Sequence, residues 1–578
     1  MENTGQKGYT KPDMASFATR VARQLKIIYK DDFSESLVNR ILRLTHVHYD
    51  ARPAWDEKDA VLITYGNSIC KPGEAALLTL HRFLKERLRQ IISCIHILPF
   101  FPFTSDDGFS VSDYMQVNPE LGDWEDITTL ASDFDVMSDL VVNHVSADHQ
   151  WFKNYLTGTV PGKNYFIEPD PGFDYSKVIR PRSTPLFNRF EIPGGYREVW
   201  TTFSADQVDL NFSNPDVLIE MIRVLLFYIS KGIRIIRLDA IAFLWKTKGT
   251  SCLHQPETHQ IVKLLRDIVT FVCPGTLILT ETNVPNLENW SYFGNGDEAH
   301  MVYQFSLPPL LLQALFSGSS KYLNQWAMQI PVLLPDQTFL NYTASHDGIG
   351  IRPLEGLLPG EELEQLMEGM IGFGGQISKK TNPDGSLSPY EINITYVDAM
   401  KGDKNGTDYM QEERFICSQT IMMSLLGIPA FYFNSLVGAA NDYDGVKITG
   451  RARSINHRRW CEDELNNLLL SETLHKRLFE GLSRLIRIRR KCSAFHPGCH
   501  QKILTPDERV FAIERHNPKT GETICCISNV TAKPIEIKRI AGSEKKGYDL
   551  ISSEQLEISD RIFLNSYQTR WIIAKNPC

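Results

Sequence analysis

The chain has 578 residues, 42% of them hydrophobic and 22% charged, with a formal net charge of −8 and a pI near 6.0. That length exceeds one ordinary hydrophobic core, so we expect a large catalytic domain with smaller attached or inserted ones. The mixed, slightly acidic charge argues against a nucleic-acid partner. The first residues carry no apolar signal core, and no stretch has the roughly 18 apolar residues of a membrane span. We therefore expect a cytoplasmic protein without a membrane partner.

The eleven cysteines are scattered and form no C-x-x-C pair, which predicts reduced, packed thiols and no disulfide framework. His496, Cys499 and His500 lie close together in the sequence. Structural zinc normally takes four ligands, however, and a fourth at finger-like spacing is missing. We expect no metal there.

Eight short apolar runs rich in β-branched and aromatic residues predict strands. They lie at residues 61–66, 94–100, 136–144, 233–240, 277–283, 301–307, 338–347 and 428–435. Between them lie helix candidates such as residues 77–92 and 216–232, whose apolar residues recur every three or four positions. Eight alternations of strand and helix predict an α/β fold, a (β/α)8 TIM barrel.

Two segments interrupt the alternation. Residues 145–210 are rich in Pro, Gly and Asp, and predict an irregular domain inserted after strand 3. Residues from about 350 to 410 predict a second loop insertion, after strand 7. Beyond about residue 500, short alternating runs predict a C-terminal antiparallel β domain. The expected organisation is a barrel with an N-terminal extension (1–144 and 211–500), the inserted domain (145–210) and the β domain (501–578).

Polar side chains end several of the predicted strands. Arg237 and Asp239 break the apolar run KGIRIIRLDAIAFLW and, being two residues apart, point to the same side of a strand. Either could belong to a structural ion pair, and a lone histidine at a strand end is more often a core residue. Active sites of TIM barrels gather at the carboxyl ends of the strands, however. Other strands end in Asp139, Asn143, His144, Glu281, His346 and Asp347.

Four stretches, DLVVNH, IRLDA, LTETN and TASHD, resemble the ordered motifs of the α-amylase superfamily, glycoside hydrolase family 13. HILPFFPFTSDDGF, LGDWEDI, EAHMVYQFSLPPLLL and SHDGIGIRPLEGLLP are similar to the branch that contains the sucrose, sucrose 6-phosphate, glucosylglycerol and glucosylglycerate phosphorylases. The resemblance covers roughly residues 60 to 570. It implies a retaining α-glucosyl phosphorylase, a glycosyltransferase that needs no cofactor.

The resemblance also implies a role for each matching residue. Asp239 is the expected nucleophile, Glu281 the acid/base, and Asp347 the carboxylate that holds the 2- and 3-hydroxyls of glucose. The expected glucose contacts are Arg237, His144, His346, Phe203, Asp106 and Phe109, with Arg453 reaching Asp106 and the 4-hydroxyl. Retaining transfer needs one ionised and one protonated carboxyl group about 5 to 5.5 Å apart. We expect Arg237 to keep Asp239 ionised and burial to keep Glu281 protonated.

The second acceptor is the point at which a phosphorylase and a hydrolase differ. Phosphate is a dianion, so its site needs cations and hydroxyl donors. By resemblance, Arg182 and Tyr390 are the expected phosphate contacts. A retaining α-glucosidase or transglucosidase, using water or a sugar, is the alternative.

The leaving group is less well defined by the sequence. Glu391 stands where similar sucrose phosphorylases have Gln, which argues against sucrose, and Pro181 brings no basic group for sucrose 6-phosphate. Glycerate would want a cation, and Arg352 is offset by Glu355 and Glu391. This balance favours glucosylglycerol, with glucosylglycerate next.

Calcium is the metal that the resemblance raises, because Asn143 matches a calcium ligand of many amylases. Calcium takes six to eight oxygens, and the insertion lacks a dedicated Asp cluster. We therefore expect no calcium. Some barrels of this superfamily are non-catalytic scaffolds, but those typically lose the three carboxylates that this chain keeps. We expect a monomer or homodimer whose partners are a small glucoside and inorganic phosphate.

Overall fold

The computed structural model describes residues 13–182, 184–382, 386–505, 507–538, 546–557 and 561–574. Eight parallel strands close into a barrel in the order β1-β18-β12-β11-β10-β9-β4-β3. They are β1 (Val61–Thr64), β3 (Cys94–Ile97), β4 (Asp135–Val141), β9 (Ile233–Asp239), β10 (Leu277–Thr280), β11 (Met301–Tyr303), β12 (Thr338–Tyr342) and β18 (Ile428–Tyr432). Each overlaps one of the eight predicted runs, so the predicted TIM barrel is confirmed.

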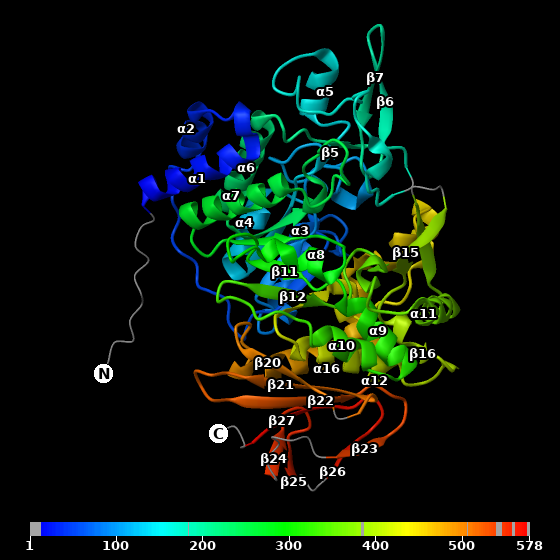
Figure 1. Ribbon diagram of the computed structural model, residues 1–578. Helices are drawn as coiled ribbons and strands as arrows, with labels where there is room; N and C mark the ends of the chain where they lie inside the picture. Colours follow the sequence, from blue (N-terminus) through cyan, green and yellow to red (C-terminus); the bar gives the residue numbers. More distant parts are fainter. Residues whose placement is uncertain are drawn as a thin grey trace.

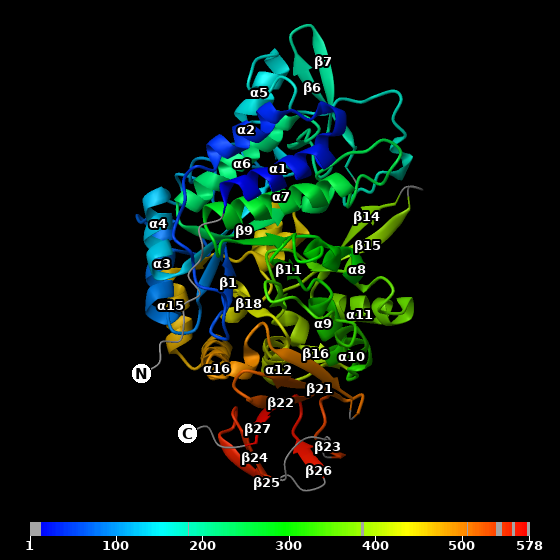
Figure 2. The ribbon, with the colours of Figure 1, turned by 60° about the vertical axis from the view of Figure 1, so that its left-hand side comes forward.

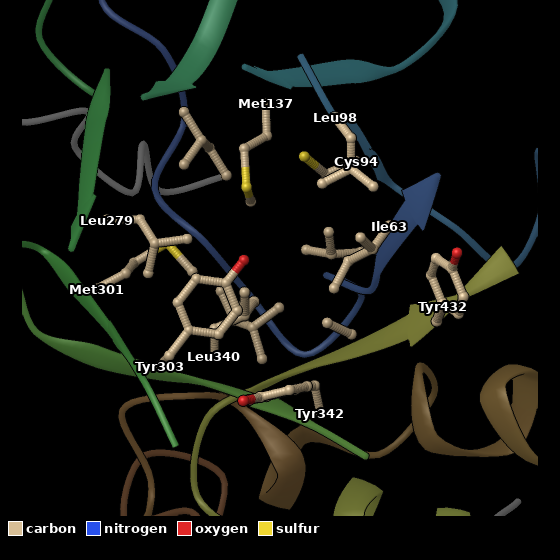
Figure 3. Close-up of a cluster of buried hydrophobic side chains, with 14 of the residues drawn as sticks. Ile63, Cys94, Leu98, Met137, Leu279, Met301, Tyr303, Leu340, Tyr342 and Tyr432 are labelled. Carbon is tan, nitrogen blue, oxygen red and sulfur yellow. The ribbon is translucent and has the colours of Figure 1, made fainter. Parts of the chain in front are cut away.

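The interior of the barrel is a packed core and not a pore. Figure 3 shows side chains that point inward from neighbouring strands, among them Ile63, Met137, Leu279, Met301 and Leu340, and all five are buried. The helices outside bury the other face of the strands. Burial on both faces explains why the strand sequences are almost continuously apolar.

Helices surround the barrel in Figures 1 and 2. They include α3 (Ala76–Arg87), α4 (Trp124–Asp133), α6 (Pro215–Ser230), α7 (Pro256–Val272), α9 (Leu307–Ser317), α12 (Gln411–Ser424) and α16 (Leu474–Arg489). Helix α6 shows why these segments start where they do. The Asn214 side chain accepts a hydrogen bond from the backbone N–H of Asp216, and Pro215 occupies the first turn.

Shorter elements complete the barrel region. They are β2 (Ile69–Cys70), α8 (Asn286–Trp290), α10 (Lys321–Ala327), α13 (Phe433–Leu436), α14 (Tyr443–Thr449), β19 (Trp460–Cys461) and α15 (Glu462–Leu470). The N-terminal helices α1 (Met14–Tyr29) and α2 (Glu35–Leu44) lie on the outside of the barrel. Helix α1 packs on α7, where the rings of Phe17 and Phe271 stack with centroids 3.9 Å apart.

The segment after β4 forms the expected insertion, coloured cyan at the top of Figure 1. It contains β5 (His144–Ser146), α5 (Gln150–Thr157), β6 (Phe187–Ile192), β7 (Gly195–Trp200) and β8 (Gln207–Asp209). Strands β6 and β7 form an antiparallel hairpin, and β5 pairs with β8. A small cluster of buried residues around Val178, Trp200 and Cys252 stabilises this segment separately from the barrel core.

The segment after β12 is the second expected insertion. Its strands β13 (Ile349–Gly350), β15 (Leu387–Asn393) and β14 (Gln376–Thr381) form a three-stranded sheet with β15 in the middle. Helix α11 (Gly360–Gly372) and the hairpin of β16 (Gly402–Asp403) and β17 (Gly406–Thr407) complete it. In Figures 1 and 2 the sheet lies beside the barrel, next to the cyan insertion.

The C-terminal residues form the predicted antiparallel β structure at the opposite end of the molecule (Figure 1). Six strands pair in the order β20-β21-β22-β27-β24-β25, and β23 pairs with β26. Their bounds are His500–Leu504, Val510–His516, Thr523–Asn529, Thr569–Ile573, Lys546–Asp549 and Glu554–Glu557, then Ile535–Lys538 and Arg561–Leu564. The domain boundaries proposed from the sequence stay predictions. Within the described ranges, every helix is too short or too polar to cross a bilayer.

Candidate active site

A cavity opens where the carboxyl ends of the barrel strands meet the two insertions. Its volume, including the part that is open to solvent, is about 900 Å³. The structure brings all the candidate site residues to its walls: Asp106, Phe109, His144, Arg182, Phe203, Arg237, Asp239, Glu281, His346, Asp347, Arg352, Tyr390, Glu391 and Arg453. Their individual roles stay predictions, but they share one cavity, as a single substrate site requires.

A buried ion network anchors the floor of the cavity. Arg237 and Asp239 lie on β9, and Nη1 of Arg237 donates to Oδ1 of Asp239 at 2.8 Å. The same Nη1 contacts Oδ1 of Asp139 on the adjacent strand β4, where Asp139 is directly opposite Arg237. Oδ2 of Asp139 lies 2.7 Å from Nε2 of His96 on β3. The nucleophile candidate Asp239 therefore shares its guanidinium with a second carboxylate.

Glu281 follows strand β10 and lies next to Asp239. Its Oε2 accepts a hydrogen bond of 2.9 Å from the backbone N–H of Ala240. Ala240 has φ of 50°, a left-handed conformation that turns the residue after the nucleophile candidate toward Glu281. The backbone N–H of Glu281 also donates to the carbonyl oxygen of Leu238 at 3.1 Å, so the acid/base and nucleophile candidates are held on adjacent strands.

Both carboxyl groups have raised pKa values. Burial raises the pKa of Asp239, and the charges of Glu281 and Asp139 raise it further against the effect of Arg237. Burial likewise raises the pKa of Glu281, and Asp347 adds to this. Arg237 lowers the pKa of Asp239, but burial outweighs it, and the expectation that Arg237 keeps Asp239 ionised stays a prediction.

Asp347 lies just beyond β12 and is held by a different cation. Nη1 of Arg453 lies 2.9 Å from its Oδ1, and Nη2 of Arg453 lies 2.6 Å from Oε1 of Glu391. Burial alone would raise the pKa of Asp347, but His346 and Arg453 lower it well below its usual range. Asp347 is therefore an anion in the folded protein. The expected contact of Arg453 with Asp106 is replaced, among these described residues, by its pairs with Asp347 and Glu391.

Asp106 starts a turn with an unusual backbone. Asp106 and Asp107 have φ of 54° and 51°, and Gly108 follows with φ of 113°. A Cβ at Gly108 would lie 2.7 Å from the carbonyl oxygen of Pro99, so this position requires glycine. Nε2 of Gln207 donates to Oδ2 of Asp106 at 3.2 Å. Gln207 lies in no motif of the sequence and was missed.

Aromatic rings form one wall of the same region. The ring of Phe109 stacks on His346, with centroids 4.9 Å apart and planes 10° apart. Phe203 lies on His144 with centroids 5.2 Å apart, and Nε2 of His144 lies 2.9 Å from the carbonyl oxygen of Phe109. Flat apolar rings beside carboxylates suit a pyranose, which has apolar C–H faces and a polar rim.

Two cations of the cavity were missed by sequence reasoning. Arg180 and Lys380 line it together with Arg182 and Arg352. Nε and Nη2 of Arg180 are buried with no hydrogen-bond partner among the described residues. Burial lowers the pKa of Lys380, and the charge of Arg352 lowers it further, against the effect of Glu355. Charged residues in a loop are usually exposed to solvent, so the sequence did not indicate that Arg180 and Lys380 line the cavity.

The family model for the α-amylase catalytic domain matches residues 88–339. The chain is 46% identical over 530 residues to the glucosylglycerate phosphorylase of Spirochaeta thermophila, covering 89% of this chain and 90% of that one. The chain belongs to the α-amylase family. Its place within the family is the branch that contains the sucrose phosphorylases, and its enzyme class is that of the glycosyltransferase-type phosphorylases. The family resemblance found in the sequence is confirmed.

Two further members of this α-amylase branch are similar. The glucosylglycerol phosphorylase of Marinobacter adhaerens is 28% identical over 442 residues, covering 74% of this chain and 87% of that one. The crystal structure of sucrose 6F-phosphate phosphorylase from Thermoanaerobacter thermosaccharolyticum aligns with a TM-score of 0.72 at 24% identity, over 88% of this chain and 98% of that one. This structural match supports the fold.

The position that matches a calcium ligand in many α-amylase family members holds a cation of the protein itself. Nζ of Lys246 lies 2.8 Å from Oδ1 of Asn143, 2.7 Å from Oδ2 of Asp209 and 2.7 Å from the carbonyl oxygen of Phe243. Among the described residues, no group of three or more His, Cys, Asp or Glu side chains is arranged to hold a metal. The ammonium group of Lys246 supplies the positive charge beside the buried carboxylate of Asp209. Lys246 is 103 residues from Asn143, and sequence reasoning missed it.

Proposed function

We propose that this phosphorylase acts on glucosylglycerate. It would transfer the α-glucosyl group to inorganic phosphate with retention, giving α-glucose 1-phosphate and free glycerate. One observation carries the proposal: the carboxyl groups of Asp239, Glu281 and Asp347 line one cavity together with four cations that form no ion pair with these carboxylates among the described residues, namely Arg180, Arg182, Arg352 and Lys380.

In the first half-reaction, the Asp239 carboxylate attacks the anomeric carbon. The bond from that carbon to the glycerate oxygen breaks, and Glu281 transfers its proton to the leaving oxygen. Of the two carboxyl groups with raised pKa, Asp239 is the one in contact with Arg237. When the two carboxyl groups share one proton, we therefore expect Asp239 to be ionised and Glu281 to be protonated. Asp347, an anion, holds the ring hydroxyls and stabilises the positive charge that develops on the sugar.

In the second half-reaction, a phosphate oxygen attacks the same carbon. The bond to Asp239 breaks, and Glu281 takes back a proton from the phosphate, by the reverse of the first step. Arg182 and Tyr390 line the cavity and can donate to the dianion. Two buried nitrogens of Arg180 have no partner among the described residues, whereas buried polar groups normally have one. This supports a phosphate site in the same cavity.

Glycerate now ranks above glycerol as the leaving group, which reverses the order expected from the sequence. That expectation counted Glu355 and Glu391 as charges facing the acceptor. Glu391 pairs with Arg453, whose Nη2 lies 2.6 Å away and which it shares with Asp347, and the described walls of the cavity do not include Glu355. The identity of 46% to a glucosylglycerate phosphorylase, against 28% to a glucosylglycerol phosphorylase, supports the same order.

The test is a panel of acceptors in the reverse direction. The protein is incubated with α-glucose 1-phosphate and, in turn, glycerate, glycerol, fructose and fructose 6-phosphate, and phosphate release is measured. We expect glycerate to have the highest kcat/KM. A preference for glycerol or fructose would contradict the acceptor, while release of glucose from glucosylglycerate without phosphate would support the hydrolase alternative.

The nucleophile is tested separately. Asp239→Asn should abolish turnover and leave the melting temperature within a few degrees of the parent. Asp444→Asn, a surface carboxylate whose side chain is 85% exposed, is the control and should keep full activity. Undiminished activity of Asp239→Asn would refute the assignment.

A further inference from the structure

Two of the cavity cations come from the same small sheet. Lys380 lies on β14 opposite Ser388 of β15, and Arg352 follows β13, whose Gly350 is opposite Glu391 of β15. Both side chains line the cavity. The sheet of β13, β15 and β14 therefore presents two positive charges to the substrate from outside the barrel.

This sheet reaches the acid/base candidate through Asn283, which is two residues after Glu281. A Cβ built on Gly350 would lie 2.7 Å from Oδ1 of Asn283, so the backbone of β13 packs directly on that side chain. Glu281 is the group that protonates the departing oxygen in the proposed function. The end of β13 that carries Arg352 is thus near the side from which the leaving group departs.

The two cations are poorly neutralised. Nη2 of Arg352 lies 3.6 Å from Oε2 of Glu288, an oxygen that also lies 3.1 Å from Nε2 of His254. Lys380 has no ion pair among the described residues; burial lowers the pKa of its half-buried ammonium, Glu355 raises it, and repulsion from Arg352 lowers it again. An anion placed against both would remove this repulsion, because an opposite charge favours the charged form.

Arg182 has different surroundings. It is one of the cations that, against the effect of burial, lower the pKa of Asp347, so it lies near the glucose end of the cavity. The charge of Arg352 acts instead on Lys380. Arg182, like the ion-paired Arg237 and Arg453, therefore lies toward the glucose end of the cavity, where phosphate must attack, whereas Lys380 and Arg352 form a separate pair beside the leaving group.

On the basis of the proposed function, we infer that Lys380 and Arg352 bind the carboxylate of glycerate and make this phosphorylase prefer an anionic acceptor to glycerol. Oδ1 of Asn283, buried and without a partner among the described residues, accepts a hydrogen bond from the glycerate hydroxyl. Glycerol offers the hydroxyl but no carboxylate, and so it forgoes both charge-assisted contacts.

The experiment compares glycerate with glycerol as acceptors of glucose from α-glucose 1-phosphate. Lys380→Met removes the charge and keeps much of the side-chain length. Lys379→Met is the matched control, because Lys379 is the exposed neighbour on β14 and points to the other face of the strand. We expect the ratio of kcat/KM for glycerate to that for glycerol to fall tenfold or more in Lys380→Met, roughly the effect of one hydrogen bond to a charged group. Lys379→Met should keep the ratio of the parent.

Two further variants and one measurement make the outcome specific. Arg352→Gln should lower the same ratio, and Lys380→Arg should restore most of it. An unchanged ratio in Lys380→Met, with the melting temperature of the parent, would overturn the inference. So would a rise in the KM for phosphate without a change in the acceptor ratio, since the cations would then serve phosphate. If the parent enzyme itself prefers glycerol, the proposed function fails as well, and this is seen before any variant is made.

Discussion

His457 connects the two acidic segments at the glucose end of the cavity. Its Nε2 lies 2.7 Å from the carbonyl oxygen of His346, and its Nδ1 lies 3.4 Å from Oδ2 of Asp107. The two ring nitrogens of His457 therefore contact oxygens of two different segments. Asp107 adjoins Asp106, and His346 adjoins Asp347, so one side chain links the segments of two carboxylates that are expected to contact glucose.

This link predicts that His457 and Asp107 are positioning residues. The hydrogen bond from His457 lowers the pKa of Asp107 and keeps it anionic beside the left-handed turn. Asp107→Asn and His457→Gln should raise the KM for the glucoside roughly fivefold, the effect of about one net hydrogen bond, while kcat changes less. Steady-state kinetics with Asp444→Asn as control checks this. A fall in kcat at constant KM would indicate that the link acts on the chemical step instead.

The raised pKa of Glu281 predicts the pH dependence of the first step. A general acid must be protonated, so kcat/KM for the glucoside should fall as the pH rises through the pKa of Glu281, which burial places above the ordinary value of about 4.3. Glu281→Gln should lose this alkaline limb together with most of its activity. With α-glucosyl fluoride, whose leaving group needs no proton, the variant should keep formation of the glucosyl enzyme. Equal loss with both substrates would argue against the acid role.

The lowered pKa of Asp139 predicts that the free energy of unfolding depends on pH. Burial would raise its pKa, but Arg237 and His96 lower it to about 2, below the value of about 3.9 in an unfolded chain. A depressed pKa stabilises the folded state above the unfolded value, and this contribution is lost as the pH falls toward the folded one.

Asp139→Asn should therefore lower the free energy of unfolding near neutral pH by about 3 kcal/mol, because Arg237 is left with fewer anionic partners. The difference from the parent should narrow between about pH 4 and about pH 3. Urea unfolding of both proteins at several pH values measures it. A constant difference over this range would contradict the assigned charge of Asp139.

Lys246 predicts a stability effect that is independent of substrate. Removing its ammonium would leave Asp209 buried without a cation, which typically costs about 3 kcal/mol or more. Lys246→Met should unfold at a clearly lower temperature than Lys248→Met, a control two residues away whose side chain is 61% exposed. Calorimetry of the two variants gives the comparison. Equal melting temperatures would mean that Lys246 does not hold the insertion to the barrel.

The barrel was predictable because strands that are buried on both faces appear in the sequence as short, almost continuously apolar runs. The run at residues 301–307 shows the limit, since only Met301–Tyr303 is strand and α9 starts at Leu307. The positions of Asp239, Glu281 and Asp347 were predictable because Asp239 ends β9, Glu281 directly follows β10, and Asp347 follows β12 after a short loop. The place of Lys380 in the cavity was not predictable, because a helix and a loop separate it in the sequence from Arg352, the cation beside it. Neither was the pairing of Arg453 with Glu391, 62 residues apart, which reversed the charge argument for the acceptor.

The location of the two cations proposed to bind the acceptor has a consequence for how this enzyme could diversify. Arg237 and Asp239, which are expected to contact the sugar, lie on a strand whose register closes the barrel, so changes there threaten folding itself. Lys380 and Arg352 belong to a ribbon that takes no part in that closure. Substitutions in the ribbon could exchange one leaving group for another while the glucosyl-transfer machinery is inherited intact.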